Sequence, residues 1–209
     1  VAKQLKLAGS IADVTVTDGI SGRVTTMAVT TKDGQDMVLT GNQVRAALDL
    51  DSTWFTPSLL QLLPAARAIT YGGAASLSGL VRGADGVALE AKPAGTAVWS
   101  PAGALVPDLD GGFSAIVRPQ TSTWYRLAWG DVRAGLAKIS VSARVAAAVS
   151  GTTVPGTLHP AAPGAPMQMQ QQAADCTLDT IPSTHADPAS EWSFADVAPG
   201  SYPVRAAPR

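Results

Sequence analysis

The run Ala-Ser-Leu-Ser-Gly-Leu-Val at residues 75–81 is the first of six short apolar runs that Gly and Pro separate. With 20 Gly, 15 Pro and only 15% charged residues in 209, the chain favours short strands joined by turns over a helical bundle. Turns at intervals of about 8–12 residues are typical of a small β-sandwich. The expected strands are 75–81, 87–91, 96–100, 112–117, 123–129 and 136–145.

The six expected strands belong to the second segment of the chain, residues 66–145. A third segment, which begins near residue 146, repeats this second segment. Gly156 lies 77 residues after Gly79, and Tyr202 lies 77 residues after Tyr125. Two further pairs agree at nearly the same offset: Gly86 with Gly164, and Phe113-Ser114 with Trp192-Ser193. We therefore expect two copies of one fold. Within the second copy, the Gln/Ala-rich and then Ser/Thr/Pro-rich stretch 168–187 predicts a mobile loop.

The first 60 residues read as mixed α and β structure. Ile-Ala-Asp-Val-Thr-Val at 11–16 alternates with the period of a half-buried strand, and a run rich in Val and Thr follows at 23–31. Lys32 to Gln35 predicts a hairpin turn into a strand at 37–40. Asn42 is a suitable N-cap for a short helix ending at Leu48, with Val44, Ala47 and Leu48 facing inward, and 52–55 should be extended.

Composition excludes several classes of protein. The formal charge is −1 and the 15 basic residues are scattered along the sequence, which argues against nucleic-acid binding. No apolar run reaches the roughly 18–20 residues of a membrane span. Cys176 is the only cysteine, so no internal disulfide forms, and we expect a buried or incidental thiol. The chain lacks a signal peptide, but it opens at Val1, and we expect it to be trimmed there.

A pair of motifs in the N-terminal segment carries a family resemblance. Ser21-Gly22-Arg23-Val24 follows the first strand. The second motif comes roughly 20 residues later: Gly41, Arg45, Leu48, Leu50 and Ser52-Thr53-Trp54-Phe55. Together they resemble the C-terminal portion of the SpoIID/LytB family, the stage II sporulation protein D family. Asp49 stands where that family often has Gly.

The resemblance implies an exported bacterial protein, secreted or in the cell envelope. Family members are similar to lytic transglycosylases of peptidoglycan or to enhancers of cell-wall amidases. Their catalytic Glu lies upstream of the portion seen here. The implied partners are peptidoglycan glycan strands, a cell-wall amidase, or the missing N-terminal half of the domain itself. The later segments resemble bacterial immunoglobulin-like domains, and Pro199-Gly200-x-Tyr202 is also similar to carboxypeptidase regulatory-like sandwiches.

The expected fold class is mainly β. An incomplete α+β SpoIID/LytB-type segment at 1–63 precedes two small immunoglobulin-like β-sandwiches at 66–145 and 146–209. Seven apolar side chains of the first segment should be exposed and need cover from another chain or module: Ile11, Val14, Val16, Val24, Met27, Val38 and Leu48.

No residue is expected to be catalytic, and no cofactor is expected. Transglycosylase chemistry needs a positioned carboxylic acid. The only glutamates, Glu90 and Glu191, fall outside the family-like segment and should lie at the surface. Asp49 and Asp51 flank the end of a short helix, where turn hydrogen bonds are the better interpretation.

No metal site is expected either. His159 and His185 are the only histidines and lack ligands at matched spacing, even with Cys176 nearby. Asp108-Leu109-Asp110-Gly111-Gly112 is weakly similar to a calcium loop but lacks the later ligands, so it predicts a hairpin turn.

The candidate ligand-binding residues are Ser21, Arg23, Arg45, Ser52 and Trp54. Arg23 and Arg45 either bind sugar hydroxyls and peptide carboxylates of the wall, or brace their own domain. The five tryptophans could stack on sugars or fill cores: Trp54, Trp99, Trp124, Trp129 and Trp192. Two hypotheses stay open, a fragment of a wall-remodelling protein, or an envelope module that is structural or binds protein.

Overall fold

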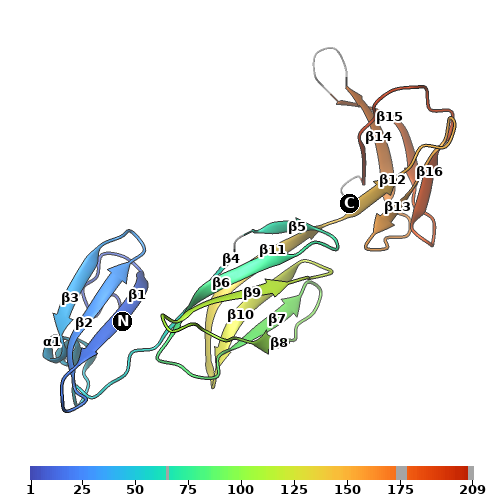
Figure 1. The fold of residues 1–209 in the computed structure, drawn as a ribbon. Helices are drawn as coiled ribbons and strands as arrows, with labels where there is room; N and C mark the ends of the chain where they lie inside the picture. The colour runs from blue at the N-terminus through green and yellow to red at the C-terminus, as the bar shows by residue number, and fades with distance from the viewer. Residues whose placement is uncertain (65, 173–177, 207–209) are drawn as a thin grey trace. The chain divides into compact units, whose positions relative to one another are not determined.

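The computed structural model describes residues 1–64, 66–172 and 178–206 (Figure 1). Strands make up 53% and helix 4% of the chain, which confirms the expected mainly β fold with small sandwiches. Contacts divide it into two compact units: Val1–Ala65 with Ser76–Val117 and Trp124–Lys138, and Ala66–Ala75 with Arg118–Thr123 and Ile139–Arg209. None of the helices in the described part of the chain is long and apolar enough to cross a membrane.

The N-terminal segment forms an antiparallel three-stranded sheet followed by one helix. The sheet has the order β1-β2-β3 and comprises β1 (Ile11–Asp18), β2 (Val24–Thr31) and β3 (Asp36–Thr40), and α1 is Gly41–Leu48. These elements confirm the expected strands and helix. Residues 52–55, expected as extended structure, form no strand.

The helix is capped differently from the prediction. Thr40, not Asn42, is the N-cap. Its Oγ1 accepts a hydrogen bond from the Gln43 backbone N–H at 3.2 Å, and Gln43 Oε1 accepts one from the Thr40 N–H at 2.8 Å. This reciprocal pair satisfies two donors that the first turn leaves unpaired, so Thr40 outcompetes Asn42. Asp49 ends the helix with φ +54°, a conformation that favours Gly and that Asp tolerates.

The N-terminal segment buries more of its apolar side chains than expected. Its core contains Leu5, Val14, Met27, Val29 and Val44. Of the seven side chains predicted to be exposed, Val14, Val24 and Met27 are buried, and Ile11, Val16 and Leu48 are half-buried. Only Val38 is largely exposed, at 68%. The prediction was therefore wrong for most of the patch, because Leu5, Phe55 and the inner face of α1 pack against the sheet.

The second segment contains two sheets. The first has the order β4-β6-β9, with β4 (Leu59–Pro64), β6 (Ala75–Arg82) and β9 (Gly112–Val117). The second has the order β5-β11-β10-β7-β8, with β5 (Ala68–Thr70), β7 (Ala88–Pro93), β8 (Ser100–Ala104), β10 (Thr123–Trp129) and β11 (Val132–Ser142). Alternate residues along these strands, including Leu77, Leu89 and Leu127, are buried.

Most strand predictions in this segment match the structure. The predictions for 112–117 and 123–129 coincide with β9 and β10. The prediction for 96–100 was wrong, because Thr96 belongs to a turn: its N–H and hydroxyl both donate to the Pro93 carbonyl, at 3.2 and 2.8 Å. The strand β8 therefore begins only at Ser100.

The third segment is a sandwich of two three-stranded sheets. One has the order β12-β13-β16, with β12 (Arg144–Ala147), β13 (Val154–His159) and β16 (Glu191–Phe194). The other has the order β15-β14-β17, with β14 (Pro166–Gln172), β15 (Leu178–His185) and β17 (Val204–Ala206). Leu158, Trp192 and Phe194 of the first sheet share one core with Met167 and Met169 of the second.

Within the stretch 168–187, predicted as a mobile loop, residues 168–172 and 178–185 are instead paired strands, and residues 173–177 lie outside the described ranges. β14 pairs with β15 in antiparallel fashion, from Pro166 opposite His185 to Gln172 opposite Leu178. Met167 and Met169 are buried at 0% and 1% exposure, while Gln168 between them is only half-buried. The Gln-rich composition concealed this alternation. Cys176, and with it the expectation for its thiol, lies outside the described residues.

The two sandwiches share one strand arrangement, but their bounds differ from the expected ones. The first copy begins with β4 at Leu59 and the second with β12 at Arg144, earlier than 66 and 146, and β5 and β11 have no counterpart among the described strands of the third segment. β4-β6-β9 corresponds to β12-β13-β16, and β10-β7-β8 corresponds to β17-β14-β15. Gly79 and Gly156 both lie on the central strand of their three-stranded sheets. Tyr125 lies in β10, and Tyr202 lies two residues before the corresponding β17.

The turns before the corresponding strands β9 and β16 are the same. Asp108 Oδ1 accepts hydrogen bonds from the N–H groups of Asp110 and Gly112, at 3.0 and 2.7 Å. Asp187 Oδ1 accepts from Ala189 and Glu191, both at 2.8 Å. The Asp108 segment is therefore a carboxylate-capped turn, in line with the expected turn, and its counterpart supports the repeat.

Candidate functional site

Two segments far apart in the sequence meet at one end of the N-terminal sheet, where its central strand β2 begins. The turn between β1 and β2 carries Ser21 and Arg23, and the segment after α1 carries Ser52 and Trp54. The Val24 N–H donates to the Thr53 carbonyl at 2.9 Å. This bond fixes residues 52–54 beside Val24, the first residue of β2.

Side-chain contacts complete the junction. The Trp54 indole Nε1–H donates to the Ser21 carbonyl at 2.9 Å. Ser52 Oγ accepts from the Trp54 backbone N–H at 3.0 Å and from Arg23 Nη1 at 3.3 Å. The Arg23 guanidinium carbon lies 5.2 Å from the centroid of the Trp54 ring. We call Ser21, Arg23, Ser52 and Trp54 the Arg23–Trp54 surface.

Trp54 is held in place and yet faces solvent. Its side chain is 64% exposed although its only polar atom is hydrogen-bonded. An apolar ring fixed in this way offers a flat surface at low entropic cost, as aromatic anchors in binding sites do. The neighbouring guanidinium supplies donors for hydroxyl or carboxylate oxygens. The arrangement suits a ligand with both apolar faces and oxygen acceptors, such as a sugar ring.

A shallow groove of about 340 Å³ adjoins this surface. Its polar lining residues are Ser21, Arg23, Thr25, Thr40, Asn42 and Thr53. Thr25, Thr40, Asn42 and Thr53 were not among the predicted site residues. Thr53 belongs to the second motif and Asn42 was the candidate N-cap, but neither pattern marks a groove, because the groove exists only where the β1–β2 turn, the start of α1 and the 52–54 segment come together.

Four of the five predicted binding residues therefore lie together, and the fifth does not join them. Arg45, in the last turn of α1, is exposed. Among the described residues, its side chain takes part in none of the hydrogen bonds, ion pairs or ring contacts. Neither interpretation of Arg45, wall binding or bracing, gains support from a contact. Arg23 does brace its own domain, through its hydrogen bond to Ser52, and its exposed side chain leaves the wall-binding interpretation a prediction.

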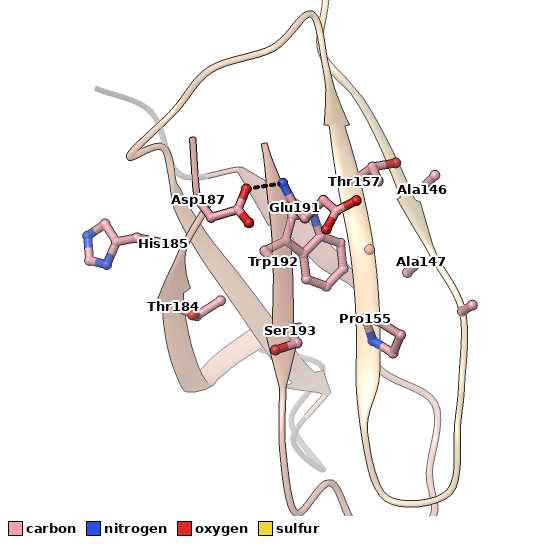
Figure 2. Close-up of a pocket in the computed structure, with 12 residues that line it drawn as sticks. Ala146, Ala147, Pro155, Thr157, Thr184, His185, Asp187, Glu191, Trp192 and Ser193 are labelled. Atoms are coloured by element: carbon pink, nitrogen blue, oxygen red, sulfur yellow. Dashed lines mark hydrogen bonds between the residues drawn. The ribbon is translucent and has the colours of Figure 1, made fainter. Parts of the chain in front are cut away.

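A larger pocket lies in the third segment (Figure 2). Its volume is about 660 Å³, and its lining includes Thr157, His185, Asp187, Glu191 and Trp192. Figure 2 shows the His185 ring turned away from the Glu191 carboxylate. Asp187 is occupied by its turn, since it accepts from the Glu191 N–H.

The Trp192 indole is part of the core and is not a free surface in this pocket. It is 4% exposed and packs against Gly156, where an added Cβ would overlap the ring. Its Nε1–H is shielded from solvent and has no hydrogen-bond partner among the residues that the structure describes. We therefore favour the Arg23–Trp54 surface. Within the ranges that the structure describes, no group of three or more His, Cys, Asp and Glu side chains could hold a metal ion.

Comparisons with known proteins do not assign the chain. No family model matches it, and no curated protein matches it. Solved structures with a similar arrangement include a tetra-tandem repeat in the extending region of a large adhesion protein, with TM-score 0.34 and 12% identity. The matched region covers 82% of this chain and 47% of the adhesion-protein chain.

Two other solved structures show a likeness of the same order. Trypsin-activated α2-macroglobulin from Escherichia coli has TM-score 0.33 and 14% identity, over 83% of this chain and 16% of that one. The chicken CNTN1 FN1–FN3 domains have TM-score 0.25 and 11% identity, and the match covers 87% of this chain and 70% of the CNTN1 chain. This chain thus spans less than half of the adhesion and macroglobulin structures, and likeness at this level does not establish a shared function.

Proposed function

We propose that this chain is a wall-binding portion of an exported bacterial cell-wall remodelling protein of the SpoIID/LytB kind. In this proposal the Arg23–Trp54 surface contacts peptidoglycan glycan strands. The supporting observation is that Trp54 is held by the Ser21 carbonyl and Arg23 while 64% exposed. All four residues of this surface belong to the two motifs that carry the family resemblance.

Substituting Trp54 by alanine is expected to weaken binding of the chain to purified sacculi by about tenfold. The stacking surface is lost, which corresponds to about 1–1.5 kcal/mol. Arg23→Lys keeps the charge but loses the planar guanidinium, so an intermediate loss is expected. Co-sedimentation with sacculi measures both.

The matched control is Ile116→Ala, which removes a 73% exposed apolar side chain from strand β9, away from the Arg23–Trp54 surface. It should bind sacculi like the unmodified chain. If Trp54→Ala also binds like the unmodified chain, or if Ile116→Ala loses as much, the Arg23–Trp54 surface does not contact the wall.

The isolated chain is expected not to degrade peptidoglycan. Glu90 Oε2 accepts a hydrogen bond from Arg126 Nε at 2.7 Å and lies 3.4 Å from Arg133 Nε, so this carboxylate is engaged in ion pairs within its own sheet and is not presented to a substrate. Glu191 is exposed on β16. Mass spectrometry of sacculi incubated with the chain tests this. Release of anhydro-muropeptides that Glu90→Gln or Glu191→Gln abolishes would contradict it.

A second candidate function is a structural or protein-binding module of the envelope. The repetition of one sandwich favours it, because tandem copies of a fold are common in extended spacers. The sacculus experiment separates the two candidates, since a pure spacer has no affinity for the wall that depends on Trp54.

A further inference from the structure

The outer face of the five-stranded sheet gathers basic side chains that are scattered in the sequence. Four basic side chains and two tryptophans lie there, and we call this set the cationic face: Lys92, Arg126, Arg133, Lys138, Trp99 and Trp124. These residues are scattered along the sequence, and strand pairing gathers them because it brings β7, β10 and β11 side by side.

Strand alternation explains why the outward side chains of β7 and β10 share a face, and contacts place the other members of the set beside them. In β10, Trp124 and Arg126 alternate with Thr123, Tyr125 and Leu127, all of which are buried. In β7, Glu90 and Lys92 have the same parity, opposite to buried Leu89. Residues two apart on a strand point to the same side of the sheet. The contact between Arg126 and Glu90, at 2.7 Å, places the two strands' outward residues together.

The tryptophans hold the cations in fixed positions. The Arg126 guanidinium carbon lies 4.1 Å from the centroid of the Trp99 ring, and Lys92 Nζ lies 5.3 Å from it. On the neighbouring strand pair, Lys138 Nζ lies 5.4 Å from the Trp124 ring. Cation–π contacts of this kind restrict the cations without neutralising them. Less side-chain freedom is therefore lost when a ligand binds.

One carboxylate offsets only part of this charge. Glu90 lies between Arg126 and Arg133, and its side chain is 17% exposed. It positions the two guanidinium groups, while Lys92 and Lys138 lie outside the pair. The face thus carries four cations against one anion, although the whole chain has a formal charge of −1.

We propose that the cationic face binds an anionic polysaccharide whose carboxylate, phosphate or sulfate groups contact Lys92, Arg126, Arg133 and Lys138. The cations extend across several strands of an open sheet, which suits an elongated polyanion better than a small ligand. A nucleic acid fits less well, because cations already lie over the Trp99 and Trp124 rings where bases would stack. This site is separate from the Arg23–Trp54 surface and does not depend on it.

The test measures binding of the full chain to fluorescein-labelled polymers by fluorescence polarisation. Dextran sulfate and polygalacturonate are the anionic probes, neutral dextran is the uncharged control, and an oligothymidylate represents nucleic acid. Both anionic polymers should bind, more weakly as salt rises, and dextran should not. The tighter of the two identifies the anion type, sulfate-like or carboxylate.

Two variants assign binding to this face. The double variant Lys92→Gln with Lys138→Gln should lower the affinity about tenfold. The slope of log affinity against log salt concentration should also fall by about two, because each lost contact between a lysine and an anionic group lowers that slope by about one. Lys3→Gln with Lys32→Gln makes the same charge change at two exposed residues elsewhere and should stay within about twofold. Trp99→Ala keeps every charge but removes the ring that positions two of them, so a loss of about two- to fivefold is expected.

Three results would overturn the proposal. One is failure of both anionic polymers to bind, or binding of neutral dextran as tight as theirs. Another is an equal loss in the Lys3/Lys32 variant, which would show a response to total charge alone. The third is tighter binding of oligothymidylate than of either polysaccharide.

Discussion

Replacing Gly79 or Gly156 by alanine is expected to destabilise the sandwich that contains it by about 3 kcal/mol or more. A Cβ at Gly79 would overlap the carbonyl oxygen of Gln61 on the paired strand and lie 2.8 Å from the Phe113 ring. A Cβ at Gly156 would overlap the Trp192 ring and the Ala146 carbonyl oxygen. Backbone in a paired strand cannot move aside cheaply, so the cost should reach or exceed the upper end for overpacked cores.

The appropriate control is Gly95→Ala. Gly95 has φ +82° and open space where its Cβ would lie, so this variant adds only backbone strain, about 1–2 kcal/mol. Urea unfolding with circular dichroism measures all three variants. If Gly79→Ala and Gly156→Ala cost no more than Gly95→Ala, the close approach of a ring to each glycine does not constrain the fold.

These glycines also explain why the repeat is detectable in the sequence alone. Gly79 and Phe113 form a glycine–aromatic contact across neighbouring strands, and Gly156 and Trp192 form the same contact in the second copy. An aromatic ring can lie flat over a strand only where that strand lacks a side chain. The agreement of Gly79 with Gly156, and of Phe113 with Trp192, thus reflects one spatial contact that both copies need.

Other parts of the fold were not predictable from local patterns. The stretch 168–187 was expected to be a loop because Gln and Ser dominate it, yet Met167 and Met169 are core residues on one face of β14. Half-buried Gln168 between them is compatible with a strand. Which face of β14 is buried depends on the facing sheet β12-β13-β16, which a local sequence pattern does not show. The expected N-cap was wrong for a similar reason, since Asn42 and Thr40 are both suitable and Gln43 decides between them.

Of the two candidate sites, one was predicted from the sequence and the other was not. Ser21, Arg23, Ser52 and Trp54 belong to a motif pair, and they do lie together. The cationic face was missed although Trp124 and Arg126 stand two apart in a predicted strand. The sequence indicates that both point outward, but the partners Trp99 and Lys138 come from outside that strand, and strand order is not encoded locally. Convergence of this kind depends on topology.

Truncating Leu89 or Met167 to alanine is expected to cost about 2–5 kcal/mol each, and to loosen a different sandwich in each case. The two residues occupy corresponding positions, three residues after Gly86 and Gly164, and they are 1% and 0% exposed. Each fills a core that cannot collapse fully around the missing atoms. Met167 packs in a core formed only by residues of the third segment.

Hydrogen exchange measured by mass spectrometry distinguishes the two effects. Leu89→Ala should raise exchange in peptides from β6 to β10, and Met167→Ala in peptides from β13 to β16, because each cavity lowers the local free energy of opening. Ile116→Ala, at an exposed side chain, should change neither. If Met167→Ala raised exchange equally in both sets of peptides, the two copies would unfold as one cooperative unit, contrary to the prediction of two separate cores.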